Sequence, residues 1–585
     1  MGEPIRIANC SGFFGDRLSG AREMVDDGPI DVLTGDWLAE LTMLILSRIR
    51  AKQPGRGFAA TFVTQIEHVM GTCLDRGIKV VSNAGGLDPG GCADAVSEIA
   101  DRLGLSPTVA YVDGDDLLPR LDDLVTAGEL QPFGTGELVD VGNSLTANAY
   151  LGCFGIVEAL ERGADIVITG RVTDAAVVCG PAAWHHEWAR DDWDALAGAV
   201  VAGHIIECSA QATGGNYSFF TEVSGLDQPG FPWAEIAADG SSVIGKHDGT
   251  GGEVSIGTVT SQILYEIGGP RYLGPDVTAR FDTIHLRQTE PDRVRVEGTR
   301  GEPPPSTLKV AMNELGGYRN TVAVALTGLD IEAKAAAVEA AFWRRCPFGP
   351  DDFATVDTRV IRTDQADPAS NEAATAQWRL TVKDPDERKV GRSFSNSFVE
   401  TALSSIPGLY GLGGGPSAAT PYGVYRPATV PAYLVPAYVH IGGRTTQVDS
   451  AARESRPGPA RHEPANEQSA AAPLGLTERL PLGRIVGARS GDKGGDANLG
   501  VFVRSAAAYD WMRWFLTVDR IRELLPECGP LPIERYELPN LWALNFVVRG
   551  LLQEGVAAST RIDGQAKSLG EWLRARYADI PRDLL

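Results

Sequence analysis

The sequence predicts a mixed α/β fold whose N-terminal region is built around a mostly parallel sheet. Strand-like and helix-like segments alternate through the first third of the 585-residue chain. This alternation is typical of parallel sheets with helices on both faces. In addition, Ile166–Ile168 is a short β-branched run, the pattern of a parallel strand that is covered on both faces.

The expected elements follow one another as strand, loop and helix. In the N-terminal region, strands are expected at Ile5–Ala8, Phe58–Val63, Lys79–Asn83 and Val109–Val112, and helices at Ile66–Arg76 and Ala93–Leu103. After about Asn216, glycine and proline become frequent and apolar residues recur at every second position. Residues 216–444 are therefore expected to form an α+β part of the same core. Its expected strands are Glu253–Val259, Phe281–Arg287, Arg293–Glu297, Thr307–Met312 and Thr321–Leu326, and its long helix is Ile331–Arg344.

The rest of the chain divides into a linker and a small domain. Residues 445–480 contain few apolar side chains and many Ala, Ser, Pro, Glu and Arg residues, which predicts a disordered linker. Residues 481–585 have about the length of one small domain. Strands are expected near Leu482–Ala488, Leu499–Val503, Ile533–Glu537, Ala543–Val548 and Ala557–Ile562, and helices near Tyr509–Leu525 and Leu569–Tyr577. Two helices among several strands predict a ferredoxin-like α+β domain.

Composition excludes several classes of partner. The chain has 53 basic and 76 acidic residues and a formal net charge of −23, which argues against nucleic acids and anionic membranes. It has neither a secretory signal nor the roughly 20-residue apolar run of a membrane helix, so we expect a cytoplasmic protein. The eight cysteines are scattered, which favours reduced, buried thiols over disulfides or a zinc site. No metal site is predicted.

The segment Ala164–Val178 contains the first candidate site. Its strand ends at Gly170, which we expect to let the backbone turn, and the next residues include Arg171, Thr173 and Asp174. In open α/β sheets, ligands bind where strands end and helices begin. A cation, a hydroxyl and a carboxylate at such a position form a plausible site. The structural alternative is a helix start, with Thr173 or Asp174 as the N-cap and Arg171 as an ion-pair partner.

A second candidate is the pair His204 and Glu207. These residues are three positions apart and share a face if the segment is helical. A histidine beside a carboxylate is a plausible general acid–base pair, although many such pairs are purely structural. The pair precedes a polar glycine-rich turn that contains Asn216.

Two glycine-rich loops are candidates for holding an anion. The segment SNAGGLDPGG contains Asn83, Gly85 and Gly86 between a strand and a helix, where backbone amides can approach an anion. A purely structural turn is the alternative. The segment GKHDGTGG contains Lys246 and His247, which suit a carboxylate or phosphate group. Its alternative is a hairpin turn with solvated charges.

The small C-terminal domain contains the densest polar glycine loop of the chain, SGDKGGDANLGV, with Asp492, Lys493 and Asn498. Solvent-exposed turns can have the same composition. No G-x-S-x-G elbow, H-E-x-x-H motif, kinase motif set or phosphate-binding P-loop occurs, which disfavours serine hydrolases, zincins, kinases and P-loop ATPases.

Several long motifs together resemble the acyclic terpene utilisation (AtuA) family. They are IANCSGFFGD, LTGDWLAELTM, VSNAGGLDP, ANAYLG, GADIVITGRVTDAA, AGHIIECSAQATGGNYS, KHDGTGGEVSIGTVT and GEPPPSTLKV. SGDKGGDANLGV, LPNLWALNF and RIDGQAKS resemble the ferredoxin-fold domain that often ends its members. The resemblance covers nearly the whole chain except the linker. It implies a role in bacterial catabolism of acyclic terpenes such as citronellol and geraniol and of related branched acids, which proceeds through coenzyme A thioesters.

We therefore expect a lyase or hydratase that acts on a branched or terpenoid acyl-CoA, or on a related carboxylate. Such a reaction needs a base, an acid and donors for an enolate-like oxygen. Asp174 or Glu207 is the expected base, His204 the expected acid, and Arg171 a donor. The residues expected to bind substrate are Asn83, Gly85, Gly86, Thr173, Asn216, Lys246, His247, Asp492, Lys493 and Asn498.

Other interpretations stay open at this point. Lys493 and Asn498 either close the site or build a subunit interface, and we expect a homo-oligomer. No cofactor is firmly implied, and coenzyme A would enter only as part of the substrate. The chain could instead be a non-catalytic subunit that binds coenzyme A thioesters or assembles a terpenoid-degrading complex. An ATP-dependent ligase is a third alternative, which the missing P-loop disfavours.

Overall fold

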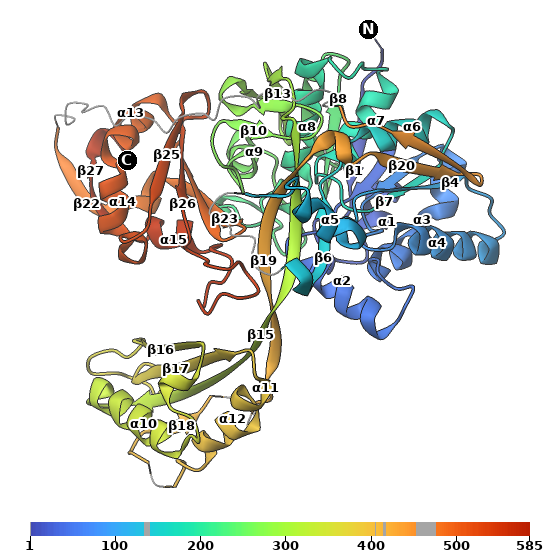
Figure 1. Cartoon of the computed structure of the whole chain (residues 1–585). Coiled ribbons are helices and arrows are strands. Elements are labelled where there is room, and N and C mark those ends of the chain that lie inside the picture. Colours follow the sequence, from blue (N-terminus) through green and yellow to red (C-terminus); the bar gives the residue numbers. More distant parts are fainter. Residues whose placement is uncertain (1, 134–140, 404, 413–416, 452–474) are drawn as a thin grey trace. The chain divides into compact units, whose positions relative to one another are not determined.

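The structure is a computed structural model that describes residues 2–133, 141–403, 405–412, 417–451 and 475–585 (Figure 1). Contacts within the chain define two units. Unit 1 comprises Met1–Asn313, Tyr425–Val556 and Gln565–Leu585, and unit 2 comprises Glu314–Val424 and Ala557–Gly564. Among the residues described, no helix is long and apolar enough to cross a membrane.

Unit 1 is built on an 11-stranded mixed sheet in the order β12-β13-β9-β8-β1-β2-β3-β7-β4-β20-β21. The five central strands are parallel: β1 (Ile5–Asn9), β2 (Val32–Gly35), β3 (Lys79–Ser82), β7 (Ile166–Thr169) and β4 (Val109–Asp113). The flanking strands are antiparallel to their neighbours: β8 (Pro232–Ile236), β9 (Ser242–Lys246), β13 (Arg293–Glu297) and β12 (His285–Glu290) on one side, β20 (Ala437–Ile441) and β21 (Arg444–Val448) on the other.

The prediction of a mostly parallel N-terminal sheet is therefore correct only for the centre of the sheet. Short turns join β8 to β9 and β20 to β21, and such turns can connect only antiparallel strands. Gly240 supplies the positive φ of the first turn, and Gly442 and Gly443 supply those of the second. Strands from residues 216–444 thus extend the N-terminal sheet on both sides.

Helices cover both faces of this sheet, each over its own apolar core. One core combines α1 (Gly20–Asp26), α3 (Ala60–Arg76) and α4 (Pro89–Leu103), and the other α6 (Phe154–Glu161), α7 (Ala176–His185) and α8 (Trp193–Ile206). Strand β7 contributes to both, because Ile166 and Ile168 belong to the first core and Val167 to the second. This alternation confirms the prediction that the β-branched run is a strand covered on both faces.

The N-terminal part contains further elements outside the large sheet and the helices named above. They are α2 (Glu40–Lys52), α5 (Leu121–Thr126), β5 (Gln131–Pro132), β6 (Ser144–Ala149), α9 (Ile256–Ile263) and the three-stranded sheet of β10 (Arg271–Leu273), β11 (Thr278–Arg280) and β14 (Arg300–Glu302).

Two expected strands are helices, and a third is partly helical. Phe58–Val63 runs into α3, because Phe62 is the first of a series of buried residues at helical spacing. Glu253–Val259 leads into α9, whose first turn is capped by the Ser255 side chain accepting from Thr258 N at 3.4 Å. Phe281–Arg287 begins with a 3-10 turn before β12 starts.

The C-terminal domain has a separate core beneath a four-stranded antiparallel sheet. Its elements are β23 (Gly487–Lys493), β24 (Asp496–Phe502), β26 (Ala543–Val548) and β25 (Ile533–Leu538), with α13 (Ala506–Phe515), α14 (Val518–Leu524) and α15 (Leu569–Arg574). The expected helix at Tyr509–Leu525 is two helices, because Thr517 caps a new one by accepting from Arg520 N at 3.1 Å. Ala557–Ile562 is not a strand.

Both ends of the predicted linker are strands, which corrects the expectation of disorder over 445–480. Strand β21 forms a hairpin with β20, and β22 (Thr477–Pro481) pairs with β27 (Tyr577–Pro581). These two segments are ordered by backbone hydrogen bonds to their partner strands, although they contain few apolar side chains that could be buried. Residues 452–474 of the predicted linker lie outside the described residues.

Unit 2 has its own small core. The 21-residue strand β15 (Thr307–Thr327) enters it, so the two expected strands at Thr307–Met312 and Thr321–Leu326 are one strand. Strand β19 (Thr420–Pro431) leaves it. The other elements are α10 (Ile331–Arg345), β16 (Thr355–Ile361), β17 (Thr375–Asp384), α11 (Glu387–Val390), α12 (Arg392–Val399) and β18 (Leu409–Gly411).

Close packing of α8 against the turn between β8 and β9 generates a test of this fold. A Cβ atom at Gly198 would lie 2.2 Å from the carbonyl oxygen of Gly240, so we expect Gly198→Ala to destabilise the protein by about 1–3 kcal/mol through overpacking. Gly71, inside α3, is the matched control, since its Cβ would meet only Leu105 at 3.9 Å. Gly71→Ala should stabilise by up to about 1 kcal/mol. Urea unfolding followed by circular dichroism measures both, and equal effects would contradict the packing described.

Candidate functional site

Polar side chains meet where the parallel strands of unit 1 end. Asn9 ends β1, and Asp36 and Asn83 directly follow β2 and β3. The Asn83 side chain donates to Asp36 Oδ1 at 2.5 Å. Asn9 Nδ2 donates to the carbonyl oxygen of Glu207 at 2.9 Å, which ties the end of α8 to this edge of the sheet. Asn83, expected from the sequence to bind substrate, therefore lies at the strand ends, paired with Asp36.

Arg171, which follows β7, carries a buried charge in this group. Its side chain is 2% exposed, and Nη1 lies 2.8 Å from Asp174 Oδ1. Nη1 also donates to the carbonyl oxygen of Leu38 at 3.2 Å, and the guanidinium lies 4.1 Å from the centre of the Tyr150 ring. A buried cation needs such partners. An ion pair of Arg171, which belongs to the structural alternative for this segment, is thus present with Asp174 as its partner, and the 29% exposed side chain of Asp174 is its outward end. The N-cap residue of α7 is Ala175 and not Thr173 or Asp174.

Asp115 holds the backbone at Arg171. Its carboxylate accepts from Arg171 N at 2.9 Å and from Asn148 Nδ2 at 2.8 Å. Burial raises the pKa of Asp115 to about 7. A Cβ atom at Gly170 would lie 2.3 Å from Asp115 Oδ1. The glycine is therefore required by the close approach of this carboxylate.

His204 and Glu207 lie at the end of α8, on one face as predicted. His204 Nδ1 and Glu207 Oε1 are 3.2 Å apart, and both side chains are buried. The rings of Tyr272 and Phe281 lie 5.2 and 5.5 Å from the imidazole. Burial lowers the pKa of His204 to about 4. It also raises the pKa of Glu207 well above its ordinary value. Near neutral pH His204 is therefore neutral, and burial favours the protonated form of Glu207 over the charged one.

The strand-end and helix-end groups form one charge cluster. Burial is the largest cause of the raised pKa of Asp36 and of Glu207, and the negative charge of Asp174 is the second largest at both. The positive charge of Arg171 lowers both pKa values. Glu266 also raises the pKa of Glu207. We call Asp36, Arg171, Asp174, His204, Glu207 and Glu266 the acidic cluster.

Sequence reasoning missed two members of the acidic cluster. Asp36 directly follows β2, just as Arg171 lies two residues after β7. Its position at the end of a strand is therefore a signal from which the sequence could have predicted it as a site residue. Glu266 follows α9 and carries no comparable local signal.

Two of the three candidates from the C-terminal domain reach the cluster through Glu266. Lys493 Nζ donates to the Glu266 carbonyl oxygen at 2.8 Å, and Asn498 Oδ1 accepts from Glu266 N at 2.8 Å. The Lys493 charge lowers the pKa of both His204 and Glu207. Asp492 lies half-buried on the same hairpin.

The candidate cations of the GKHDGTGG segment lie elsewhere. Lys246 Nζ donates to the Thr250 carbonyl oxygen at 2.8 Å and lies 3.0 Å from Asp292. His247 Nε2 lies 3.0 Å from the carbonyl oxygen of Met24 in α1. Both side chains are buried and bonded within the fold, so they are not the solvated charges of a hairpin turn that the structural alternative expected, and they lie away from the strand-end group.

The other candidates have backbone roles in the structure. A Cβ atom at Gly85 would lie 2.6 Å from the Thr169 carbonyl oxygen, and Gly86 has a positive φ of 53°. Asn216 is exposed with a φ of 58°. The half-buried Thr173 donates its N–H to the Leu151 carbonyl oxygen at 2.9 Å.

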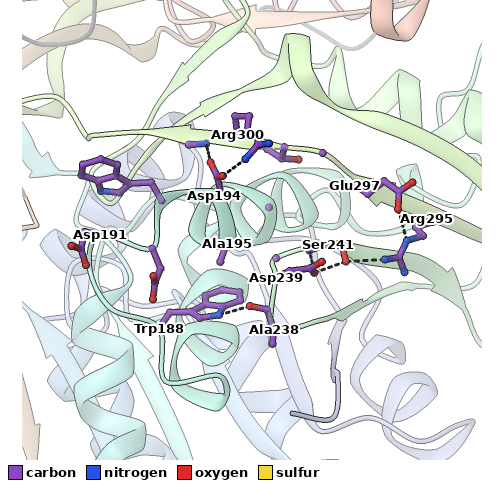
Figure 2. Close-up of a pocket in the computed structure, with 17 residues that line it drawn as sticks. Trp188, Asp191, Asp194, Ala195, Ala238, Asp239, Ser241, Arg295, Glu297 and Arg300 are labelled. Atoms are coloured by element: carbon purple, nitrogen blue, oxygen red, sulfur yellow. Dashed lines mark hydrogen bonds and ion pairs between the residues drawn. The ribbon is translucent and has the colours of Figure 1, made fainter. Parts of the chain in front are cut away.

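A cavity of about 750 Å³ lies at the start of α8, beside the turn between β8 and β9 (Figure 2). Its lining holds five carboxylates and two guanidinium groups. They are Asp191, Asp192, Asp194, Asp239 and Glu297, with Arg295 and Arg300. Arg300 pairs with Asp194 and Arg295 with Glu297, both at 2.6 Å. The excess of negative charge disfavours anionic ligands.

A second cavity of about 10 Å³ is lined by Cys10, Trp37 and Gln65 among others. Neither cavity is lined by Arg171, Asp174, His204 or Glu207. Within the described parts of the chain, no three His, Cys, Asp or Glu side chains are grouped so that they could hold a metal ion.

Comparison with known families gives two matches. The model described as acyclic terpene utilisation family protein AtuA matches residues 5–441, and the model of the AtuA ferredoxin-like domain matches residues 480–577. Neither the curated proteins nor the solved structures contain a match.

The buried charge of Arg171 generates a stability test. Arg171→Gln leaves buried carboxylates without their cation, so we expect a loss of about 3–5 kcal/mol. Arg162→Gln on α6 is the control, because Arg162 forms an i,i+4 pair with Glu158 at 2.6 Å and is 35% exposed. It should change stability by no more than about 0.5 kcal/mol. Urea unfolding midpoints measure both. A small effect at Arg171 would argue against a buried charge there.

The pKa of Asp115 generates a pH test. Its folded-state pKa of about 7 exceeds its ordinary value of 3.8, so its contribution to stability is complete below pH 3.8 and is lost as pH rises toward and through 7. We expect Asp115→Asn to reduce the decline in unfolding midpoint between about pH 4 and pH 7. Asp122→Asn, at an exposed carboxyl on α5, should leave the decline unchanged. Identical profiles for both variants would contradict the burial of Asp115.

Proposed function

Because the chain belongs to the acyclic terpene utilisation family AtuA, we propose that it is an acid–base enzyme of that catabolism. Its reaction is the addition or removal of water, or a related lyase step, on a branched or terpenoid acyl-CoA or a related carboxylate. The observation that carries the proposal is the buried Glu207, paired with His204 and with a pKa raised well above its ordinary value by burial, in the same cluster as the Arg171–Asp174 ion pair. A protonated carboxyl group near an ion-paired carboxylate gives the acid and the base that such a reaction needs.

The residues take distinct roles in the dehydrating direction. Asp174, the outward end of the ion pair, removes a proton from the carbon next to the carbonyl group. Glu207 gives its proton to the departing hydroxyl group, which leaves as water while the carbon–carbon double bond forms. Since the pKa of His204 is lowered to about 4, the histidine is neutral near pH 7. The role of acid therefore passes from His204, where the sequence placed it, to Glu207.

Arg171 stabilises the charge that develops during the reaction. Removal of the proton places negative charge on the carbonyl oxygen, and a fixed donor there lowers the barrier. Arg171 is held by its Tyr150, Leu38 and Asp174 contacts, so it needs little rearrangement. Lys246 and His247 have no part in this proposal because their contacts lie outside the acidic cluster.

The proposed roles generate an activity test. Glu207→Gln and Asp174→Asn should each lower turnover of branched 3-hydroxyacyl-CoA and enoyl-CoA thioesters by about 10²–10⁴-fold, the usual contribution of general acid–base catalysis. His247→Gln should retain turnover, since His247 contacts Met24 instead. Mass spectrometry of the thioesters measures gain or loss of water.

Two outcomes would argue against the proposal. Full turnover in both cluster variants would remove their assigned roles. Binding of the thioesters by the unmodified chain without any conversion would favour the non-catalytic binding subunit.

A further inference from the structure

The C-terminal domain holds the turn that carries Glu266. Asn498 on β24 and Asn545 on β26 are fully buried neighbours in the sheet. Asn498 accepts from Glu266 N at 2.8 Å, and Asn545 Nδ2 donates to the carbonyl oxygens of Ile267 and Gly268 at 3.2 and 2.5 Å. Buried amides placed on consecutive backbone groups define the path of the turn.

The packing around this turn is equally specific. A Cβ atom at Gly491 would lie 2.4 Å from the Tyr265 ring, and one at Gly500 would lie 2.6 Å from Leu264 Cβ. The Arg489 guanidinium lies 4.0 Å from the centre of the Tyr265 ring. Both glycines thus lie where residues 264–265 pack against the hairpin of β23 and β24, and a side chain at either position would clash.

Glu266 itself has an unusual backbone. Its φ of 56° lies in the left-handed region, which costs energy for a residue with a side chain and persists only where the surroundings impose it. Lys493 completes the fixation by donating to the Glu266 carbonyl oxygen at 2.8 Å. The carboxylate that is placed in this way raises the pKa of both His204 and Glu207.

We propose that the C-terminal domain completes the site by fixing the turn that carries Glu266, a member of the acidic cluster. Glu266 is a positioning residue, since its charge keeps the proton on Glu207 and it acts through that residue. The part of the inference that concerns Glu207 as the acid rests on the proposed function. The placement of Glu266 does not.

Amide hydrogen exchange of the full chain tests the placement. Asn498→Ala removes the acceptor of the Glu266 N–H group, so exchange in residues 264–269 should become at least about tenfold faster. Arg504→Gln is the matched control. Arg504 pairs with Glu222 at 2.9 Å, so this substitution removes a different contact of the C-terminal domain. It should leave exchange in residues 264–269 unchanged. Equal exchange in the Asn498 variant and the unmodified chain would overturn the inference.

The pH profile of kcat/KM tests the role of the charge. Glu207 must be protonated to act as the acid, so activity falls as pH rises through its pKa. Glu266→Gln removes a neighbouring negative charge and should move this fall to lower pH. If the fall moves by one pH unit, kcat/KM on the alkaline side decreases about tenfold. Glu266→Asp keeps the carboxylate, so its fall in kcat/KM should lie between those of Glu266→Gln and the unmodified chain. The fall in Arg504→Gln should occur at the same pH as in the unmodified chain.

The two measurements separate the possible failures. If Glu266→Gln follows the unmodified chain at every pH, the role of its charge is wrong. If no thioester is converted by the unmodified chain, the proposed function fails, and hydrogen exchange alone decides whether the C-terminal domain places Glu266.

Discussion

The burial of one guanidinium group organises the candidate site. Arg171 is almost wholly removed from water, and an isolated buried charge of this kind would cost several kcal/mol. The protein compensates with the Asp174 carboxylate, the Leu38 carbonyl group and the face of Tyr150. The arrangement of the loops after β2, β6 and β7 follows from the need to bring these partners to one cation.

The same cluster contains more carboxyl groups than its cations can neutralise. Burial and mutual repulsion therefore raise the pKa values of Asp36 and Glu207, and these groups keep protons that exposed carboxyls would lose. The surroundings of Asp174 are different, since its side chain is partly exposed and directly paired with Arg171. The proposed proton donor and the proposed proton acceptor are thus chemically similar side chains in different environments.

Local pattern was enough to predict part of this structure. The β-branched run of β7, an ion pair of Arg171 and the shared face of His204 and Glu207 depend on neighbours within a few residues, and each is present in the structure. Asp36 belongs to the acidic cluster because of the order of the strands in the sheet, and Glu266 because of a contact with the C-terminal domain. The periodicity of the sequence encodes neither. The prediction of a strand at Phe58–Val63 is wrong because a short apolar run fits both the strand and the helix period, and only the longer pattern of buried residues in α3 distinguishes them.

The cavity at the start of α8 has a kinetic consequence. A coenzyme A thioester carries several phosphate charges, and the carboxylates around that cavity repel it, as does the formal net charge of −23 of the whole chain. Dissolved ions screen this repulsion over about 10 Å at roughly 0.1 M ionic strength. If such a thioester is the substrate, as proposed above, its capture should become faster as salt is added, the opposite of what electrostatic steering produces between unlike charges.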